Sequence, residues 1–557
     1  MDRNTLLAFL LISLVLIFTP KYIEMVSPAR STQLEEPEEP STYSINDTLD
    51  NLGYQKSTHR KQNTLNLKLG EQDRLEETIT KVENDLYKAL ISSLGGGTIK
   101  SFEVKNYYIE DSLPVILINS FDPRSLSLGV ENLDGEAINL SGSWEIENTY
   151  IPDYLDTDLT LVFSTTLYGE RIEKTLTFSP ESFLIDISFN LGKSKNNVFR
   201  DLEFGWYGGL ASTEKDVVSD QAYFKSYLYQ GGELESQKVK EGEKEESVFN
   251  GPADWAAVRT KYFISALMPS DINIIEKSIL SSSYDLYETY NMAFVVESGR
   301  PTSFSLFLGP LEYGLIKDLS VNLDMVMDFG WSPIRPISKG VLFTLTELHR
   351  YIPNYGFVLI LFSFLVKLVV YPLTKKSYQS TAAMQTIQPE ITSLREKYKN
   401  NPQKLNQATM KLYKEKGVNP LGGCLPMLLQ MPLLLALFQV FRSTIELRSE
   451  PFIWWIKDLS APDTVLNLPF NVPIYGDQVS VLPVLMVLSM FIQQRMMSPG
   501  AQQPQQKTMQ YFMTGFFFLM FNSFPSGLNL YYTLFNVLTI LQQKLVPTTP
   551  NNKTQKR

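Results

Sequence analysis

The hydrophobic residues follow two different patterns, which divide the chain near residue 330. Within residues 61–330 they occur in short runs that alternate with polar residues, as Ile185, Ile187 and Phe189 do, and clusters of Gly, Asn, Asp and Pro separate the runs. Alternation with a period of two is typical of β-strands that bury one face. The pattern therefore predicts an all-β sandwich domain over residues 61–330.

Residues 331–545 contain long apolar runs separated by polar loops. The run from Tyr355 to Leu373 is long enough to cross a bilayer at about 1.5 Å per residue. Two later runs have uninterrupted apolar cores of only about 12 to 14 residues, which would thin the bilayer locally. These are 481–495 and 509–523. In all we predict five membrane-spanning helices in this half, at residues 355–373, 421–441, 481–495, 509–523 and 527–544.

Two further segments of this half have helical spacing but are not spans. Residues 337–352 gather their apolar side chains on one face, which predicts an amphipathic helix lying in the membrane interface. In residues 374–420 apolar positions such as Ile387 and Ile391 recur at spacings of three and four, stop before Pro402 and then resume. This indicates a helical hairpin with an apolar seam and basic outer faces. Its alternatives are a solvated connector and a surface for anionic lipid, the ribosome or a nascent chain.

The amino-terminal segment allows two interpretations. Residues 1–20 contain an apolar run from Leu6 to Phe18 behind Arg3, which fits either a signal-peptide core or a short anchor. Its length alone slightly favours a cleaved signal. Residues 21–60 are polar, acidic and contain prolines, and therefore indicate a linker.

Composition separates the same two halves and narrows the possible chemistry. The net charge of −10 combines an acidic β region with a basic, apolar remainder, so one globular fold is excluded. The single cysteine, Cys424, cannot form an intrachain disulfide, and two histidines, His59 and His349, give little support to a metal site. No catalytic constellation is evident in the β region, and we expect no cofactor.

The distribution of basic residues orients the helices. The loop 374–420 and the tail 546–557 are rich in Lys and Arg, so the positive-inside rule places both in the cytoplasm. The loop 442–480 is balanced in charge and contains Trp454 and Trp455, which fits the outer side. The β region then lies outside as well.

Lys367 is the one charge within the apolar run from Tyr355 to Leu373. A cation at the centre of a spanning helix costs about 2.5 to 3.5 kcal/mol, so it is a candidate functional residue. Lys367 lies nearer to one end of the run, however, and a Lys stem can extend to the nearer headgroups. The helix alone gives the two interpretations equal weight.

Other polar residues in the spans indicate a wet cavity around Lys367. Ser363 lies one turn from Lys367 on the same helical face, and Asn536 belongs to a polar stripe along the last helix. Gln430 lies in the second of the five spans. For each residue alone, hydrogen bonding between helices is the simpler explanation. Together they predict a polar lining.

Three motifs in this half are specific enough to identify relatives. They are Tyr371 to Thr374 (YPLT), Val418 to Pro432 (VNPLGGCLPMLLQMP) and Phe524 to Tyr532 (FPSGLNLYY). These runs resemble the YidC/Oxa1/Alb3 membrane protein insertase family, and the resemblance covers residues 331–545. The layout of the whole chain resembles the long YidC form of Gram-negative inner membranes.

The resemblance has implications for fold and site. It implies that residues 1–20 remain as an anchor, which makes six transmembrane helices with both termini in the cytoplasm, and that residues 61–330 form a periplasmic β-supersandwich. In the family one cation, usually Arg, faces a hydrophilic groove open to the cytoplasm and to lipid. The YPLT run aligns this position with Lys367. Tyr531 and Tyr532 are further candidates for contacting the client, with packing as their alternative role.

We therefore predict an insertase and chaperone of the bacterial inner membrane, not an enzyme, working alone or with the Sec translocon. The expected partners are nascent and newly made membrane proteins, Sec components, the ribosome and anionic lipid. A secondary transporter or channel that uses the same polar cavity is the alternative. A glycan-binding β domain on a membrane anchor would leave the polar cavity unexplained.

Overall fold

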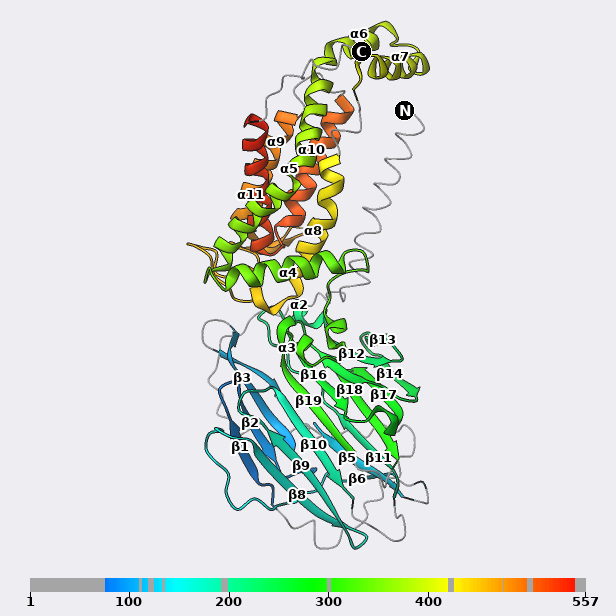
Figure 1. Ribbon diagram of the computed structural model, residues 1–557, viewed down its shortest axis with the longest axis vertical. Coiled ribbons are helices and arrows are strands. Elements are labelled where there is room, and N and C mark those ends of the chain that lie inside the picture. Colours follow the sequence, from blue (N-terminus) through cyan, green and yellow to red (C-terminus); the bar gives the residue numbers. More distant parts are fainter. Residues whose placement is uncertain are drawn as a thin grey trace. The chain divides into compact units, whose positions relative to one another are not determined.

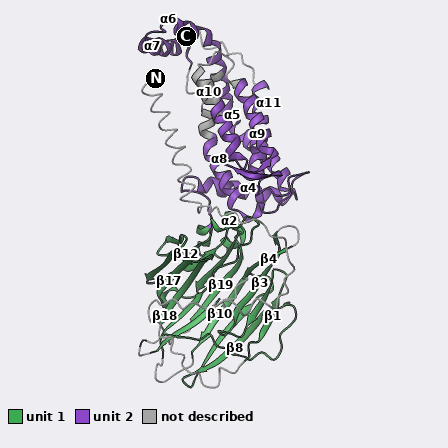
Figure 2. Cartoon of the chain, turned by 180° about the vertical axis from the view of Figure 1, so that it is seen from behind, with its two compact units in different colours: residues 1–326 green, residues 327–557 purple. Residues whose placement is uncertain are grey.

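The computed structural model describes residues 76–109, 113–118, 125–132, 135, 137–191, 199–297, 302–418, 425–473, 475–497 and 504–545. The chain divides into two compact units, Met1–Val326 and Met327–Arg557, which are coloured separately in Figure 2. The predicted anchor at residues 1–20, the linker 21–60 and the tail 546–557 lie outside the described residues.

The described part of the first unit forms three antiparallel sheets (Figure 1). The four-stranded sheet has the order β1-β2-β3-β4, with bounds Ile79–Glu83, Tyr87–Ser92, Thr98–Ile109 and Leu113–Ile118. The nine-stranded sheet has the order β13-β12-β15-β16-β19-β10-β9-β8-β7, with bounds Glu233–Gln237, Lys225–Gln230, Trp255–Arg259, Phe263–Pro269, Thr302–Pro310, Leu184–Asn190, Glu170–Phe178, Leu159–Leu167 and Glu145–Ile146. The six-stranded sheet has the order β14-β17-β18-β11-β5-β6, with bounds Lys244–Asn250, Ile275–Tyr284, Glu288–Glu297, Phe199–Trp206, Ser127–Asn132 and Ala137–Asn139. The short helices are α2 (Val217–Gln221), η2 (Ile272–Ile274), α3 (Tyr313–Asp318) and η3 (Leu323–Val326).

The two larger sheets pack face to face through their apolar side chains. The ring of Phe204 on β11 lies 4.7 Å from that of Phe189 on β10 and 5.1 Å from that of Phe304 on β19. Ile185 and Ile187 are buried on the same face of β10 as Phe189, while the residues between them are exposed. The alternation in the sequence therefore predicted this β-rich domain correctly.

One cation lies inside this domain. Lys174 on β9 is fully buried, and its ammonium donates to the carbonyls of Gly95 (3.2 Å) and Leu126 (2.7 Å). It also lies 5.6 Å from the ring centroid of Phe204. Both carbonyls belong to residues with a positive φ, which is costly for Leu126. Burial lowers the pKa of Lys174 to about 7, and the side chain ties the backbone at Gly95 and at Leu126 to β9.

The second unit is mainly helical. Its helices are α4 (Arg335–His349), α5 (Tyr355–Thr386), α6 (Gln388–Lys397), α7 (Pro402–Lys416), α8 (Leu425–Ser443), η4 (Ile445–Leu447), α9 (Val481–Met497), α10 (Pro504–Phe521) and α11 (Ser526–Leu545). Helix α4 lies across one end of the other helices, and the α6–α7 hairpin lies at the opposite end (Figure 1). A two-stranded sheet, β20 (Thr464–Val472) and β21 (Gly476–Ser480), occupies the loop before α9, which the sequence pattern did not predict.

Helix α5 continues beyond the predicted end of its membrane span at residue 373 and reaches Thr386 without a break. Within it, Tyr355–Pro372 is the one window among the described residues that is long and apolar enough to cross a membrane. The apolar parts of α9 and α10, Val481–Met496 and Tyr511–Phe521, are shorter. The count of six spanning helices therefore remains a prediction.

The α6–α7 hairpin has a small core of its own. Ile387, Ile391 and Leu412 are buried together where α6 and α7 meet. The spacing in the sequence predicted this seam. At its edge the ammonium of Lys416 lies 2.6 Å from the carboxylate of Glu390, which ties α7 to α6.

Candidate functional site

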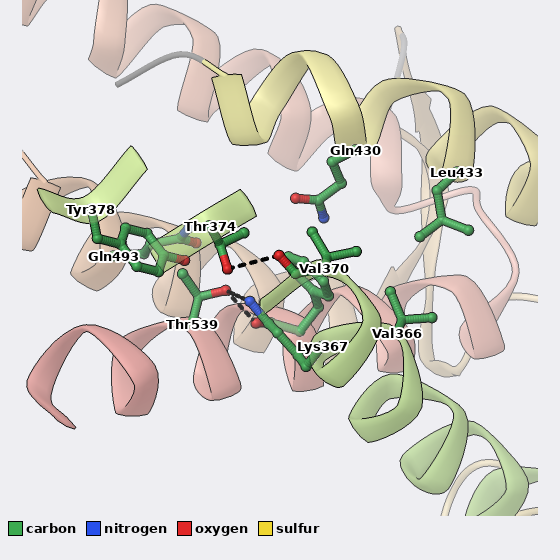
Figure 3. Close-up of a pocket in the computed structure, with 10 residues that line it drawn as sticks. Val366, Lys367, Val370, Thr374, Tyr378, Gln430, Leu433, Gln493 and Thr539 are labelled. Atoms are coloured by element: carbon green, nitrogen blue, oxygen red, sulfur yellow. Dashed lines mark hydrogen bonds between the residues drawn. The ribbon is translucent and has the colours of Figure 1, made fainter. Parts of the chain in front are cut away.

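A pocket of about 40 Å³ lies where four helices of the second unit meet (Figure 3). Each of α5, α8, α9 and α11 contributes at least one polar side chain to it. This volume holds a few water molecules, which need such polar partners. The lining residues are Val366, Lys367, Val370, Thr374, Tyr378, Gln430, Leu433, Gln493, Phe535 and Thr539.

Lys367 turns into the helix bundle. Its side chain is only 9% exposed, while its neighbours Leu368 and Val369 on the outer face of α5 are 73% and 75% exposed. The ammonium donates a hydrogen bond to Thr539 on α11 and lies 3.7 Å from the ring centroid of Phe535. A snorkelling Lys would instead extend along the outer surface. The inward position makes Lys367 part of the pocket wall.

A polar seam joins α5 to α11 around this ammonium. Thr374 lies seven residues after Lys367, nearly two full turns, so both face α11. Its hydroxyl accepts a hydrogen bond from Gln542 at 3.0 Å, and Tyr378 further along bonds to Thr539. The hydroxyl of Thr539 donates to the carbonyl of residue 535 at 2.7 Å and accepts from the ammonium of Lys367. The seam thus places a neutral acceptor, the hydroxyl of Thr539, at the ammonium.

The charge of Lys367 has no acidic partner among the described residues. Its interactions there are the hydrogen bond to Thr539 and the contact with Phe535. A buried charge without a counter-ion is costly, and such charges in membrane proteins face polar or wet interiors. The pocket therefore offers positive charge to whatever enters it.

The structure brings two of the six predicted site residues together at the pocket. Gln430 on α8 points its amide toward the space beside Lys367 (Figure 3). Ser363 is buried one turn away, but its hydroxyl donates to the carbonyl of Leu359 at 2.7 Å within the same helix. Asn536 donates to the hydroxyl of Ser489 at 3.2 Å and joins α11 to α9. Ser363 and Asn536 are thus placed outside the lining.

The two predicted tyrosines lie in an aromatic cluster between helices. Tyr531 is buried, with its ring 6.0 Å from Phe362 of α5 and 5.8 Å from Phe535. The ring of Tyr532 lies 5.6 Å from that of Phe521, at the end of α10. Both rings pack within the bundle, which corresponds to the alternative role considered for them.

Several lining residues were missed from the sequence, although signals for them existed. Thr539 follows Asn536 by three residues, so it is a neighbour of the predicted polar stripe on the helix. Gln493 belongs to a short polar group near the end of the mainly apolar helix α9, with Gln494 and Arg495 beside it. Phe535 gives no such signal, because an aromatic residue in an apolar helix is normally interpreted as a residue of the packed core.

Comparisons with known proteins agree across the chain. A family model described as the 60Kd inner membrane protein matches residues 347–553, and one described as the YidC periplasmic domain matches residues 79–342. The membrane protein insertase YidC of Chloroherpeton thalassium is 35% identical over 565 residues, which cover 98% of this chain and 95% of the relative. The corresponding protein of Chlorobaculum parvum is 33% identical over 581 residues, with coverages of 99% and 96%.

A crystal structure of an active YidC insertase, with its first transmembrane domain resolved, is also similar. It is 19% identical, covers 86% of this chain and 94% of its own, and gives a TM-score of 0.36. The family assignment rests on the sequence relatives.

Proposed function

This chain belongs to the YidC family of membrane protein insertases, and we propose that it passes client chains through the pocket around Lys367. It is an inner membrane protein with a periplasmic domain over residues 79–342, and it acts on membrane proteins without being an enzyme. The proposal concerns how the described helices would lower the barrier to insertion.

The observation that carries the proposal is the ammonium of Lys367, buried beside a pocket with polar lining residues and bonded to a neutral hydroxyl. An ammonium has three N–H donors, and the bond to Thr539 uses one of them. A carboxylate of a client would form a charge-assisted hydrogen bond, which is about twice as strong as a neutral one. The pocket therefore favours acidic residues in the segment being moved.

The short helices support the same proposal. The apolar part of α9, Val481–Met496, spans about 24 Å, and that of α10, Tyr511–Phe521, spans about 17 Å at 1.5 Å per residue. A hydrocarbon layer is about 30 Å thick. Helices shorter than this are accommodated by thinning the bilayer. A thinner layer and a polar pocket both reduce the desolvation that opposes transfer of a polar tail.

A lysine at this position fits a client chain that is bound only transiently. The family resemblance aligns Lys367 with a position that is usually Arg, and Arg binds a carboxylate through a rigid two-pronged fork. Lys is a compact point charge on a flexible stem. We infer that Lys367 attracts acidic residues without fixing their geometry, which suits release into lipid.

The test is insertion into liposomes by purified variants. Lys367→Glu and Lys367→Gln should reduce insertion of a single-span client with an acidic translocated tail, and Lys367→Arg should retain it. Lys376→Glu is the matched control, because it makes the same charge change at an exposed position of the same helix. A client whose tail acids are replaced by amides should be much less affected by Lys367→Gln.

Equal insertion of both clients by wild type and Lys367→Gln would contradict the electrostatic role. A small-solute flux assay on the same liposomes tests the transporter alternative, which requires flux that depends on Lys367. Insertion that depends on Lys367 without solute flux fits the proposal.

We also propose that the α6–α7 hairpin is a docking surface for the ribosome or for anionic lipid, and that the protein works alone and beside the Sec translocon. The hairpin carries exposed lysines on the side away from its apolar core, including Lys404, Lys411 and Lys414. Replacing these three by Gln should weaken co-sedimentation with ribosomes or with anionic vesicles. The loss of binding should be larger at low salt than at high salt, because salt screens the attraction between exposed charges. Unchanged binding to both would rule out this surface.

A further inference from the structure

The β20–β21 hairpin lies beside the helices of the second unit and pairs with none of the other described strands. Its two strands form a separate two-stranded sheet. Figure 1 shows this pair of strands projecting sideways from the bundle at the level of α4, and Figure 2 shows the same projection from behind. An isolated hairpin of this kind is only marginally stable in water. Something outside the described chain is therefore expected to surround it.

The hairpin exposes apolar residues on one face. In β20, Leu466, Leu468, Phe470 and Val472 alternate with Asn467, Pro469 and Asn471, which is typical of a strand with one apolar face. Leu466 and Phe470 are 59% and 62% exposed, and Val465, which lies at an irregularity of the strand pairing, is 50% exposed. Asp477 is the single charged residue between positions 464 and 480.

The turn and the second strand of the hairpin are attached to the bundle. Asn522, which follows α10 and is fully buried, donates to the carbonyls of Tyr475 (2.9 Å) and Gln478 (2.6 Å). Its side-chain oxygen accepts from the backbone N–H of Ser480 at 3.1 Å. The protrusion is therefore held in a defined direction by a buried amide.

The base of the hairpin is fixed to the start of α9. The carboxylate of Asp463 accepts from the indole of Trp455 (2.9 Å) and from the backbone N–H groups of Val481 (3.0 Å) and Leu482 (2.8 Å). The hairpin thus enters and leaves the bundle through rigid contacts. These contacts hold its exposed apolar residues in fixed positions at this end of the bundle.

Other exposed aromatic residues lie at the same end of the bundle. Helix α4 is too short to cross a bilayer and lies across the helix ends, with Phe343 63% exposed on its outer face. Trp454, in the loop that leads to the hairpin, is 85% exposed. Exposed aromatic residues at the ends of spanning helices are typical of the membrane interface.

We propose that the β20–β21 hairpin is a lipid anchor that lies in the headgroup region of the outer leaflet, with Leu466 and Phe470 in the acyl boundary. An amphipathic segment that carries one charge and lies near the exposed Trp454 and Phe343 fits the membrane interface, where its apolar side faces the acyl chains. The unpaired edges of the two strands need water, so the hairpin lies at the interface and not in the hydrocarbon. The assignment to the outer leaflet follows from the periplasmic domain that precedes this unit.

The test uses a fluorescent label at single cysteines. In a Cys424→Ala background, which removes the only native cysteine, Leu466→Cys and Phe470→Cys are labelled with an environment-sensitive dye and the full chain is reconstituted in liposomes. Lipids carrying a nitroxide near the headgroup, lipids carrying it deep in the acyl chain, and aqueous iodide serve as quenchers. Tyr150→Cys in the β domain is the water control, and Val369→Cys on α5 is the hydrocarbon control.

We expect positions 466 and 470 to be quenched more by the shallow nitroxide than by the deep one, and less by iodide than position 150. Iodide quenching equal to that at position 150, without nitroxide quenching, would overturn the proposal. Protection from iodide without nitroxide quenching would assign the surface to a protein partner and would overturn it as well.

Discussion

The buried Lys174 makes the stability of the periplasmic domain depend on pH in an unusual direction. Most buried cations have an acid partner, but Lys174 donates to two backbone carbonyls instead. We predict that Lys174→Met abolishes a rise in stability with increasing pH. Met preserves the length and the packing of the side chain while removing its proton.

The expected magnitude follows from the two pKa values. Burial lowers the pKa of Lys174 to about 7, whereas the ordinary value is 10.5. Between these values the unfolded chain binds a proton that the folded chain lacks, so the free energy of unfolding rises with pH. Each pH unit contributes at most about 1.4 kcal/mol. Because the folded group is still half protonated at pH 7, we expect a gain of about 2 kcal/mol between pH 7 and 9.

The assay is urea unfolding of the full chain in nanodiscs, followed by pulse proteolysis of the β domain at each pH. Other titrating groups contribute equally to wild type and variant, so the difference between their slopes isolates Lys174. Lys277→Met, at an exposed position of β17, is the control and should keep the wild-type slope. Parallel curves for wild type and Lys174→Met would show that the ammonium stays protonated, and would refute the reasoning.

Two further predictions concern the helical unit. A Cβ at Gly527 would lie 2.4 Å from the ring of Phe441, so Gly527→Ala should destabilise the unit by about 1 to 3 kcal/mol. Gly340→Ala is the control, because a Cβ there meets no atom within 4 Å and should not destabilise the unit. Thermal unfolding in nanodiscs measures both variants. Asp463→Ala should cost about 1 to 3 kcal/mol because it leaves buried donors at the start of α9 without an acceptor. Asp477→Ala is its matched control in the hairpin, and an equal loss in both variants would argue against the cap.

The strands show how much of the fold was predictable. The period of two identified the β domain. The same period puts Lys174 on the face of β9 that carries Ile172, Leu176 and Phe178, all of which are buried. A lysine in such a strand is normally interpreted as a surface residue, so the pattern predicted the face while the residue type argued against it. The alternation along the strand was the better guide to the burial of Lys174. The β20–β21 hairpin was missed although Leu466, Leu468, Phe470 and Val472 alternate with Asn467, Pro469 and Asn471, because the run is short and a proline within it argues against a strand.

The site was predictable in its charge and less so in its polar lining. Lys367 was found because a cation in an apolar run is costly wherever it points. Ser363 and Asn536 share faces with the pocket residues, but each forms its hydrogen bond with a nearer partner. Within a bundle every hydroxyl and amide takes the closest available partner, and that choice depends on helix packing that spacing does not reveal.

The uninterrupted length of α5 has a mechanical consequence. Its 32 residues form a rod about 48 Å long, with Lys367 in one half and the connection to the α6–α7 hairpin at its end. Pro372 lies between them and lacks the N–H that would complete a backbone hydrogen bond, so the rod is least stiff there. A force on the hairpin is shared between tilting the whole rod and bending it at this joint. The stiffness at Pro372 thus sets how much of a partner's push reaches the pocket.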